Sequence, residues 1–296
     1  MSDRIGVLTH AEEAAAGADA AARAAGVRIR VLAGLDELLR VDQLFAAIWR
    51  PDPGNPLITG ELLRALSKAG NYVAGAFDDT GMVGACVGFF GPPARRELHS
   101  HIAGVAPAAL GRSVGWAMKL HQRAWCLRHG VDAVTWTFDP LVSRNAYFNV
   151  VKLGGVPVQY LTNFYGGMRD DVNGGDDTDR LLLRWELSAP QVRQAARGSV
   201  RRWDAAALRR AGAVIGLDRT PQGEPLPGRV DGDTILLAVP SDIQALRRTD
   251  PACARRWRRA MREAMGPLLA DGVTVQGFDR AGWYVLTRAN AEREQR

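Results

Sequence analysis

Apolar and polar residues recur along this chain with two periods, and these periods predict a series of strands and helices. In residues 27–32, Arg28 and Arg30 alternate with apolar neighbours, a pattern typical of a half-buried strand. Residues 36–49 carry apolar side chains at helical spacing instead. The same patterns predict further helices at 59–69, 111–128 and 143–153, and further strands at 72–77, 82–90, 96–105, 131–138, 156–165 and 180–187.

The order of these elements predicts an α+β fold with α/β-type layers. Between residues 27 and 187 we expect one strand, two helices, three strands, one helix, one strand, one helix and two strands. Such a mixed order places helices on both faces of a largely antiparallel sheet. The Asp-Asp-Thr-Gly turn at 78–81 joins two of the strands as a hairpin.

The two ends of the chain differ from this central region. Residues 1–26 are an alanine-rich leader, either helical or frayed, in which we expect no function. Residues 27–188 form the predicted domain, and residues 189–296 form a C-terminal α/β region. For that region we predict a helix at 189–210, a loop rich in proline and glycine at 219–232, strands at 234–239, 273–278 and 283–287, and helices that begin near Asp242 and Asp250.

We expect the C-terminal region to pack on the preceding sheet and to form a wall of the substrate pocket. It carries more aromatic area than a separate small fragment leaves exposed, in Trp203, Trp257, Trp283 and Tyr284. The arginine run from Arg255 to Arg262 is interpreted as a solvated helix face, as most charge runs are. The alternative is that these arginines hold an acidic donor group, because guanidinium groups suit carboxylates.

Composition argues against several classes of protein. The chain has 296 residues, of which 47% are hydrophobic and 24% charged, as in ordinary globular proteins. Its net charge is +6, but only Lys68, Lys119 and Lys152 of the 38 basic residues are lysines, and the arginines are spread out. This argues against nucleic-acid binding. No apolar run has membrane-spanning length and no secretory signal is visible, so we expect a cytoplasmic protein without membrane association.

The cysteines predict neither disulfides nor a metal site. Cys86, Cys126 and Cys253 are far apart and none lies in a C-x-x-C spacing, so free thiols in a reducing cytosol are expected. Two histidines at 99 and 101 could bind zinc, but zinc needs a third ligand nearby, and we therefore predict no metal. The sequence leaves open whether the chain is a monomer or a homodimer.

A strand that runs into a glycine-bearing turn and then a helix is the first candidate site. The strand ends near Val105, and the turn contains Gly111 and Gly115. Backbone N–H groups of such a turn, together with the helix N-terminus, suit a phosphate group. The alternative is an ordinary helix start that contains glycine.

The strand before this turn is the second candidate site. Glu97, His99 and His101 are two residues apart and share one strand face, with Ser100 and Ile102 on the other. A carboxylate and two imidazoles suit a general base that takes a proton from an ammonium group. The alternative is that the histidines are hydrogen-bonded in place for packing alone.

Polar residues beyond the next strand complete the candidates. Asp139 follows a strand end, where ligand crevices form in α/β sheets, so Asp139 is a candidate for substrate binding, as is Ser100. The alternative is that Asp139 caps the following helix. In that helix Asn145 and Asn149 are four residues apart and share one face.

Residues 98–154 resemble the CoA-binding core of the GNAT superfamily, the Gcn5-related N-acyltransferases. The turn of this superfamily usually has V-x-P, then Gln or Arg, and then spaced glycines. Val105, Pro107, Gly111 and Gly115 match it, whereas Leu110 stands where Gln or Arg is usual and Ser113 where a glycine is usual. The resemblance implies the predicted fold and a CoA thioester as cosubstrate.

The resemblance also implies roles for individual residues. Backbone N–H groups of the turn would bind the CoA pyrophosphate, Arg112 would add a cation, and the two asparagines would bond the pantetheine amides. The implied CoA-binding residues are therefore Val105, Gly111, Arg112, Ser113, Val114, Gly115, Asn145 and Asn149. A backbone N–H on the strand that ends at Val105 would polarise the thioester carbonyl.

The general acid is a departure from the superfamily pattern. Many members use a tyrosine in the helix at 143–153 to protonate the departing thiolate, but Val150 occupies that place in this chain. Tyr147 lies three residues earlier. The resemblance therefore leaves Tyr147 or a water molecule as the acid.

Several short sequence segments are similar to those of one subgroup of predicted bacterial acyltransferases, which have an extra C-terminal region. They include L-H-S-H at 98–101, W-T-F-D-P-L at 136–141 and R-N-A-Y-F-N at 144–149. Some members are similar to amino-acid N-succinyltransferases. The resemblance implies direct transfer of an acetyl or succinyl group to the amine of a small molecule, with an amino acid as one candidate. The alternatives are a natural-product tailoring enzyme with a bulkier acceptor and a CoA- or small-molecule-binding module without turnover.

Overall fold

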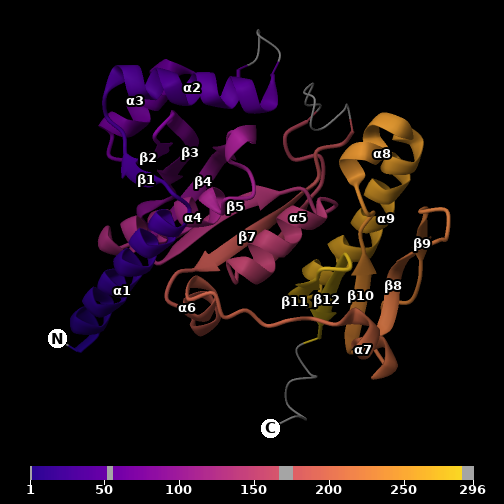
Figure 1. Cartoon of the computed structure of the whole chain (residues 1–296). Coiled ribbons are helices and arrows are strands. Elements are labelled where there is room, and N and C mark those ends of the chain that lie inside the picture. The colour runs from indigo at the N-terminus through magenta and orange to yellow at the C-terminus, as the bar shows by residue number, and fades with distance from the viewer. Residues whose placement is uncertain (1, 52–55, 167–175, 289–296) are drawn as a thin grey trace. The chain divides into compact units, whose positions relative to one another are not determined.

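The computed structural model describes residues 2–51, 56–166 and 176–288, which form two compact units (Figure 1). Unit 1 contains the described residues up to Trp136 and from Glu186 to Arg197. Unit 2 contains those from Thr137 to Trp185 and from Gly198 onward. Both units combine strands with helices, so the predicted α/β-type mixture is confirmed.

The elements of unit 1 follow the predicted order. After α1 come β1, two helices, three strands, one helix and one strand. The chain comes back to unit 1 at Glu186, and this later segment adds one short helix. The elements are α1 (Ser2–Ala24), β1 (Arg28–Val31), α2 (Leu35–Trp49), α3 (Gly60–Lys68), β2 (Tyr72–Asp78), β3 (Gly81–Phe90), β4 (Glu97–Val105), α4 (Val114–Arg128), the start of β5 (Ala133–Phe138) and α6 (Pro190–Ala196).

The sheet of unit 1 is largely antiparallel, as predicted. Its strands lie in the order β1-β2-β3-β4-β5. β1 to β4 are antiparallel neighbours, and β5 is parallel to β4 because α4 carries the chain back to the same end. The predicted hairpin is present, with Asp78 opposite Gly81.

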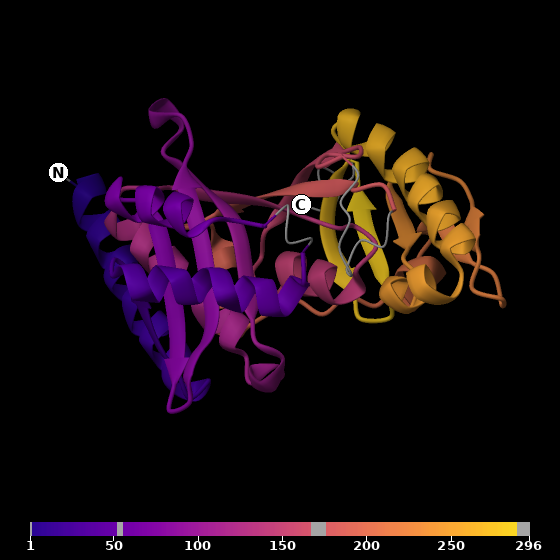
Figure 2. The same ribbon diagram turned by 90° about the horizontal axis from the view of Figure 1, so that it is seen from above.

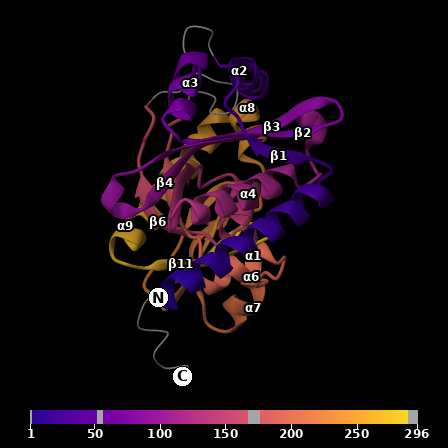
Figure 3. The ribbon, with the colours of Figure 1, turned by 90° about the vertical axis from the view of Figure 1, so that its left-hand side faces the viewer.

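Helices cover both faces of this sheet (Figure 3). α2 and α3 lie on one face, where α2 crosses the strands (Figure 2) and Leu38, Phe45 and Val87 are part of one buried apolar cluster. α4 lies on the other face. A Cβ at Gly84 of β3 would lie only 2.7 Å from the sulfur of Met118, so a larger residue there would require the Met118 side chain to shift.

α1 is a helix rather than a frayed leader. It packs along α4, and the alanines that face inward are buried, at positions Ala11, Ala14, Ala18 and Ala21. Small side chains at this helical spacing let two helices approach closely. Glu13 of α1 also binds Arg193 and Arg197 near the end of α6.

Unit 2 combines the middle of the chain with its C-terminal region. β6 (Val156–Leu161) and β7 (Arg180–Glu186) are antiparallel. Among the described residues a five-stranded sheet has the order β11-β12-β10-β8-β9. The other elements are α5 (Ser143–Ala146), a π-helix (Tyr147–Lys152), α7 (Ala205–Arg210), β8 (Val214–Arg219), β9 (Pro225–Pro227), β10 (Thr234–Ala238), α8 (Ile243–Thr249), α9 (Pro251–Ala270), β11 (Thr274–Asp279) and β12 (Trp283–Thr287).

Packing within unit 2 buries much of its aromatic area. α9 contacts β6 as well as β8 to β10 (Figure 2), and Trp257 and Tyr284 are fully buried. The ring of Trp203 lies directly against Gly277, where a Cβ would be 2.1 Å from it. Part of the C-terminal region therefore shares a core with residues 137–185.

Three expectations about secondary structure were wrong. The helix predicted at 189–210 is two helices, α6 and α7, because Gly198 takes a left-handed conformation with φ of +80° between them. β8 was not predicted, since a short apolar run after Gly212 gives little periodicity. The helix at 143–153 changes to a π-helix at Tyr147. Such segments occur often at functional sites.

Candidate functional site

β4 and β5 separate partway along their length, and this separation defines the candidate site. Their pairing runs from Glu97 with Ala133 to His99 with Thr135, whereas β4 continues to Val105. No further β4–β5 pair follows among the described residues. Backbone groups of β4 beyond His99 therefore have no β5 partner among the described residues, and we call this unpaired stretch the opening between β4 and β5.

A β-bulge lies at the point of separation. In the register of β3 with β4, Gly88 pairs with Ser100 and Val87 with Ile102, so His101 is the extra residue. The bulge returns Ile102 to the face of α2 and α3, where it packs on the apolar cluster. The expectation that Ile102 shares a face with Ser100 was wrong, because simple alternation does not account for a bulge.

The two histidines lie on the α2/α3 face beside an aromatic ring. The ring centroid of Phe89 is 5.3 Å from that of His99 and 5.9 Å from that of His101, and the two imidazoles are 6.4 Å apart. His99 Nδ1 is 3.2 Å from Thr135 Oγ1, so Thr135 orients this ring. Glu97 starts the same strand.

Both histidines are neutral at neutral pH. Burial, reinforced by the nearby His101 and Lys119, lowers the pKa of His99 to about 4. Partial loss of hydration also lowers the pKa of His101 from its usual value. A neutral imidazole has a lone pair that can accept a hydrogen bond or a proton, and the lowered pKa makes each ring a weaker base than a free histidine.

The turn after β4 presents a run of unpaired backbone N–H groups. Gly111 and Ser113 have left-handed backbones, with φ of +82° and +63°, and α4 begins at Val114 without a side-chain cap. Among the described residues no acceptor is bound by the N–H groups from Gly111 to Trp116; the next one, of Ala117, binds the carbonyl of Ser113. Open N–H groups at a helix N-terminus form an anion site.

Side chains around this turn leave the backbone accessible. The Arg112 guanidinium binds Asp78 at 2.7 Å and the carbonyl of Gly26 at 3.2 Å. Arg112 would have to leave these partners to reach a phosphate. A Cβ at Gly115 would make an ordinary contact, 3.7 Å from Val105.

The α4 face of the same sheet holds a buried polar group that we call the Lys119 cluster: Cys86, Ser100, Lys119, Gln122 and Trp136. Lys119 Nζ donates to Ser100 Oγ and to Gln122 Oε1, both at 2.9 Å, and lies 3.7 Å from the centre of the Trp136 ring. Lys119 is only 6% exposed. No carboxylate lies within 4.0 Å of its Nζ among the described residues.

The sequence analysis did not identify Lys119 as a site residue. A signal was present, because this lysine stands between Met118 and Leu120 on a helix whose inward positions recur every three to four residues. Whether such a lysine points into the sheet depends on which faces of α4 are covered. Here α1 and the sheet cover it from two sides.

In unit 2, Asp139 lies in a buried network of ion pairs. Its carboxylate accepts hydrogen bonds from Arg258 at 2.8 and 2.9 Å, from Arg247 at 2.5 Å and from the N–H of Leu141 at 2.9 Å. Asp176 binds the same arginines. The guanidinium groups hold the pKa of Asp139 well below its usual value, despite burial.

The remaining predicted residues lie on α5 and the π-helix. Asn149 is buried and Asn145 is half-buried. Tyr147 is half-buried as well, and the guanidinium of Arg280 lies 4.8 Å from the centre of its ring. Val150 is buried. These residues belong to unit 2, whereas the turn and the histidines belong to unit 1.

The arginine run of α9 is not simply a solvated face, and that expectation was wrong for several of its members. Arg258 is 2% exposed, and Arg262 binds both Asp177 and Asp179. Arg256 binds Glu224. Helical spacing places these side chains toward acidic partners that lie far away in the sequence.

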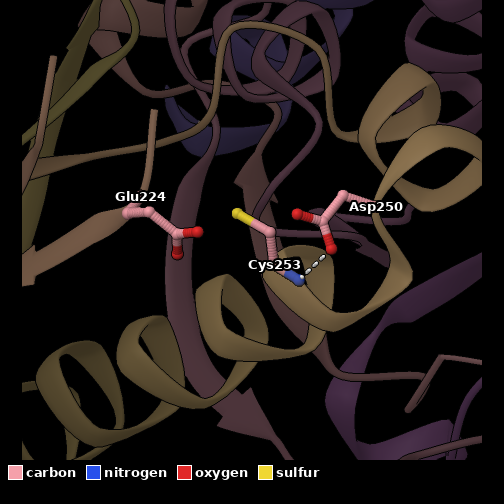
Figure 4. Close-up of side chains that lie close together, drawn as sticks. All are labelled: Glu224, Asp250 and Cys253. Atoms are coloured by element: carbon pink, nitrogen blue, oxygen red, sulfur yellow. Dashed lines mark hydrogen bonds between the residues drawn. The ribbon is translucent and has the colours of Figure 1, made fainter. Parts of the chain in front are cut away.

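One group of described residues has the composition of a metal site. Glu224, Asp250 and Cys253 point toward one another, with ligand atoms within 4.8 Å (Figure 4). However, Arg256 already neutralises Glu224 at 2.8 Å, and Asp250 caps α9 by accepting from the N–H of Cys253. These charges are used within the fold.

Two further observations concern the whole described chain. Among the described residues, none of the helices is both long and apolar enough to cross a membrane. All three cysteines are buried and free, as expected.

Comparisons with known proteins give matches only among solved structures. No protein-family model and no curated protein matches the chain. The ribosomal-protein-S18-alanine N-acetyltransferase from Escherichia coli is 12% identical over 55% of this chain and 95% of its own, with a TM-score of 0.44. An N-acetyltransferase from Staphylococcus aureus is 14% identical over 55% and 99%, with a TM-score of 0.43. An acetyltransferase of the GNAT family from Streptococcus pneumoniae is 13% identical over 53% and 97%, with a TM-score of 0.44. Values this low do not by themselves assign a family or an activity.

Proposed function

We propose that this chain is an acyl-CoA-dependent N-acyltransferase of the GNAT type, which transfers an acyl group directly from a CoA thioester to the amine of a small molecule. The observation that carries the proposal is the run of unpaired N–H groups from Gly111 to Trp116, directly after a strand that parts from its neighbour. The two features together suit a long ligand with a phosphate group at one end.

The turn would hold the pyrophosphate. Successive N–H groups and the positive end of the α4 dipole both favour negative charge. α4 has 15 residues, so its dipole is fully developed. Because the site consists of backbone groups, Leu110 and Ser113 can replace the usual family residues without loss of the donors.

The opening between β4 and β5 would hold the thioester. Backbone groups of β4 beyond His99 lack a β5 partner, so an N–H there can donate to the thioester carbonyl and stabilise the charge that develops on it. Amides of a pantetheine arm can complete the remaining strand hydrogen bonds.

The face with His99 and His101 would supply the base. An amine reaches the site as an ammonium ion and must lose a proton before it attacks. Both imidazoles are neutral and can accept that proton, directly or through a water molecule. Burial lowers the pKa of both imidazoles, that of His99 to about 4.

The proposal also extends to the identity of the acyl donor and of the amine acceptor. We favour an acetyl or succinyl donor and a small amine such as an amino acid, in a cytoplasmic protein. A tailoring enzyme with a bulkier acceptor would use the same chemistry. A binding module without turnover would bind CoA but release no thiol with any amine, and a thiol-release screen of acyl-CoA donors against amino acids separates these cases.

Replacement of Gly115 by glutamate tests the phosphate site. The new Cβ has room beside Val105, so the fold should persist, but the carboxylate would lie among the N–H groups that bind pyrophosphate. We expect calorimetry to show a loss of CoA affinity of at least tenfold.

Gly17→Glu is the matched control for this experiment. It adds the same charge in a helix of unit 1, at a position with open space around it, and should bind CoA like the wild type. Unchanged affinity of Gly115→Glu would contradict the assignment of the turn.

Replacement of the histidines tests the base. General-base catalysis contributes about two to four orders of magnitude in rate, so we expect His99→Ala or His101→Ala to lower kcat by about a hundredfold or more. On the acidic side, the fall of the wild-type rate should begin below the usual histidine pKa of 6.5, because both pKa values are lowered. If both variants keep full activity from pH 6 to 9, the base lies elsewhere.

A further inference from the structure

The Lys119 cluster contains a charge that the fold does not need for its own stability. A buried ammonium group loses its hydration, and this loss is usually offset by a carboxylate. Lys119 has only a hydroxyl, an amide oxygen and an aromatic face as partners. A methionine of similar volume would fill the same space at lower cost. A buried ionisable group of this kind is a candidate for a function.

The position of the cluster indicates what that function is. Ser100 is the first residue of β4 after its last pair with β5, and Trp136 is the first residue of β5 after the same pair. Lys119 contacts both. Its ammonium group therefore lies on the α4 side of the opening, at the level where the two strands part, while His99 and His101 lie on the opposite face.

We propose that Ser100 is the general acid that protonates the departing thiolate of CoA, and that Lys119 supplies the proton through the Ser100 hydroxyl. This inference rests on the proposed function. It places the base and the acid on opposite faces of the sheet, so that the amine would attack the thioester from one side and the sulfur would receive its proton from the other.

The proton and electron balance of the step is complete. The neutral amine nitrogen forms a bond to the thioester carbon and gives up one N–H proton to the histidine face or to water, and the carbon–sulfur bond breaks with its electron pair on sulfur. The sulfur takes the hydroxyl proton of Ser100, and Ser100 Oγ takes a proton from Lys119 Nζ over the 2.9 Å hydrogen bond. Lys119 is left as a neutral amine and regains a proton from water after the products leave.

The acidity of Lys119 fits this role. Burial lowers its pKa from the usual 10.5 to about 8, close to the value of about 8.5 for a thiol. Proton transfer between groups of matched pKa has little energetic cost and is efficient near neutral pH. Serine alone is too weak an acid, but a hydroxyl that is reprotonated as it gives up its proton avoids the alkoxide.

Other titratable groups around the ammonium do not take over this task. Cys86 on β3 lies 3.7 Å from Ser100 Oγ, and burial raises its pKa, so it stays a thiol. Burial likewise keeps Cys126 of α4 protonated, with its pKa raised well above the usual value. His99 on β4 has a lowered pKa and is neutral. Lys119 is thus the one cation of the cluster, among the residues that the structure describes.

The test uses the full chain, acetyl-CoA and the best amino-acid acceptor from the thiol-release screen. We expect Ser100→Ala to lower kcat about a hundredfold or more while its CoA affinity, measured by calorimetry, stays within a few-fold of wild type. Ser100→Thr keeps the hydroxyl and should retain most of the rate. The wild-type rate should fall above about pH 8, as Lys119 loses its proton, and Lys119→Met should lack this alkaline fall.

Cys253→Ala is the matched control, because it removes a buried free cysteine that lies in unit 2, outside the Lys119 cluster. It should keep both kcat and the alkaline fall. If Ser100→Ala does not fold, as judged by circular dichroism, the pH profile of Lys119→Met decides.

Three results separate the possible failures. If the wild type binds no CoA and releases no thiol, the proposed function fails, and this inference with it. If the wild type is active and both Ser100→Ala and Lys119→Met keep its rate and pH profile, only this inference is overturned. The same holds if Tyr147→Phe, rather than Lys119→Met, removes the alkaline fall, because Tyr147 is then the acid.

Discussion

The two units each bury a cation, and the two cations have opposite surroundings. Arg258 in unit 2 is 2% exposed and binds Asp139 through two hydrogen bonds and Asp176 through a third. Lys119 in unit 1 is 6% exposed and has no carboxylate partner among the described residues. Both groups are fully inside the protein, but only one of them is neutralised there.

This difference is the basis for treating Arg258 as a structural charge and Lys119 as the proposed proton donor. A buried ion pair with complete hydrogen bonds is held in a single state, because either partner alone would be a buried, unpaired charge. A buried ammonium without a counter-ion is close to losing its proton, and can therefore exchange it. The network around Arg258 joins α9 to residues that follow β5, whereas the Lys119 cluster lies at the opening where we place the thioester.

The largest effect on stability is expected from Arg258→Met. It leaves Asp139 and Asp176 with Arg247 as their shared partner, so one buried negative charge is no longer compensated. Removal of one member of a buried ion pair costs about 3–5 kcal/mol. We expect a loss of this size in the free energy of unfolding, measured by urea denaturation at pH 7.

Arg259→Met is the control on the same helix. Arg259 is exposed, and surface substitutions usually change stability by less than about 0.5 kcal/mol. Equal effects of the two substitutions would show that the network around Arg258 contributes nothing beyond a surface charge. Since the pKa of Asp139 is depressed, its contribution is present at neutral pH and is lost only as the pH falls below the usual range of aspartate.

A smaller effect is expected from Lys119, whose buried charge lowers the free energy of unfolding at neutral pH instead of raising it. Its folded-state pKa of about 8 is below the unfolded value near 10.5, so the unfolded chain binds more protons between these values and stability rises with pH. The unfavourable contribution of Lys119 is fully present below pH 8. It is relieved as the pH rises toward 10.

The measurement compares the free energy of unfolding of the wild type with that of Lys119→Met at pH 7 and pH 10. From pH 7 to pH 10, the free energy of unfolding of the wild type should rise by about 2 kcal/mol relative to that of the variant, since one pKa unit corresponds to about 1.4 kcal/mol. Titration of other groups cancels, because the two proteins share them. A difference that does not change with pH would mean that Lys119 has an ordinary pKa, and the contrast with Arg258 would then disappear.

Much of the fold followed from local patterns. Alternation and helical spacing predicted nearly every element up to β7, because each pattern depends on only a few consecutive residues. The helices expected from residue 59 and from near Asp242 and Asp250 begin there, where the side chains of Thr59, Asp242 and Asp250 each accept a hydrogen bond from the first turn. The errors came where local periodicity was weak or interrupted, as at β8 and at Gly198.

The candidate site was predictable only in part. The glycine-bearing turn and the pair of histidines at 99 and 101 could be identified from the sequence alone, since both depend on spacing within one segment. The bulge at His101 could not, because it is a property of the register between β3 and β4. Ser100 was named as a candidate, but its partner on α4 was not.

The sequence by itself determined the elements, their order and the chemistry available at each position. Only the tertiary structure decided which of these groups became buried and which found a partner. Lys119 and Arg258 are both basic residues on helices, and nothing local separates them. Their partners lie 19 and 119 residues away, and the interaction of a charge depends on the groups that packing brings within a few ångströms and on the water that packing removes.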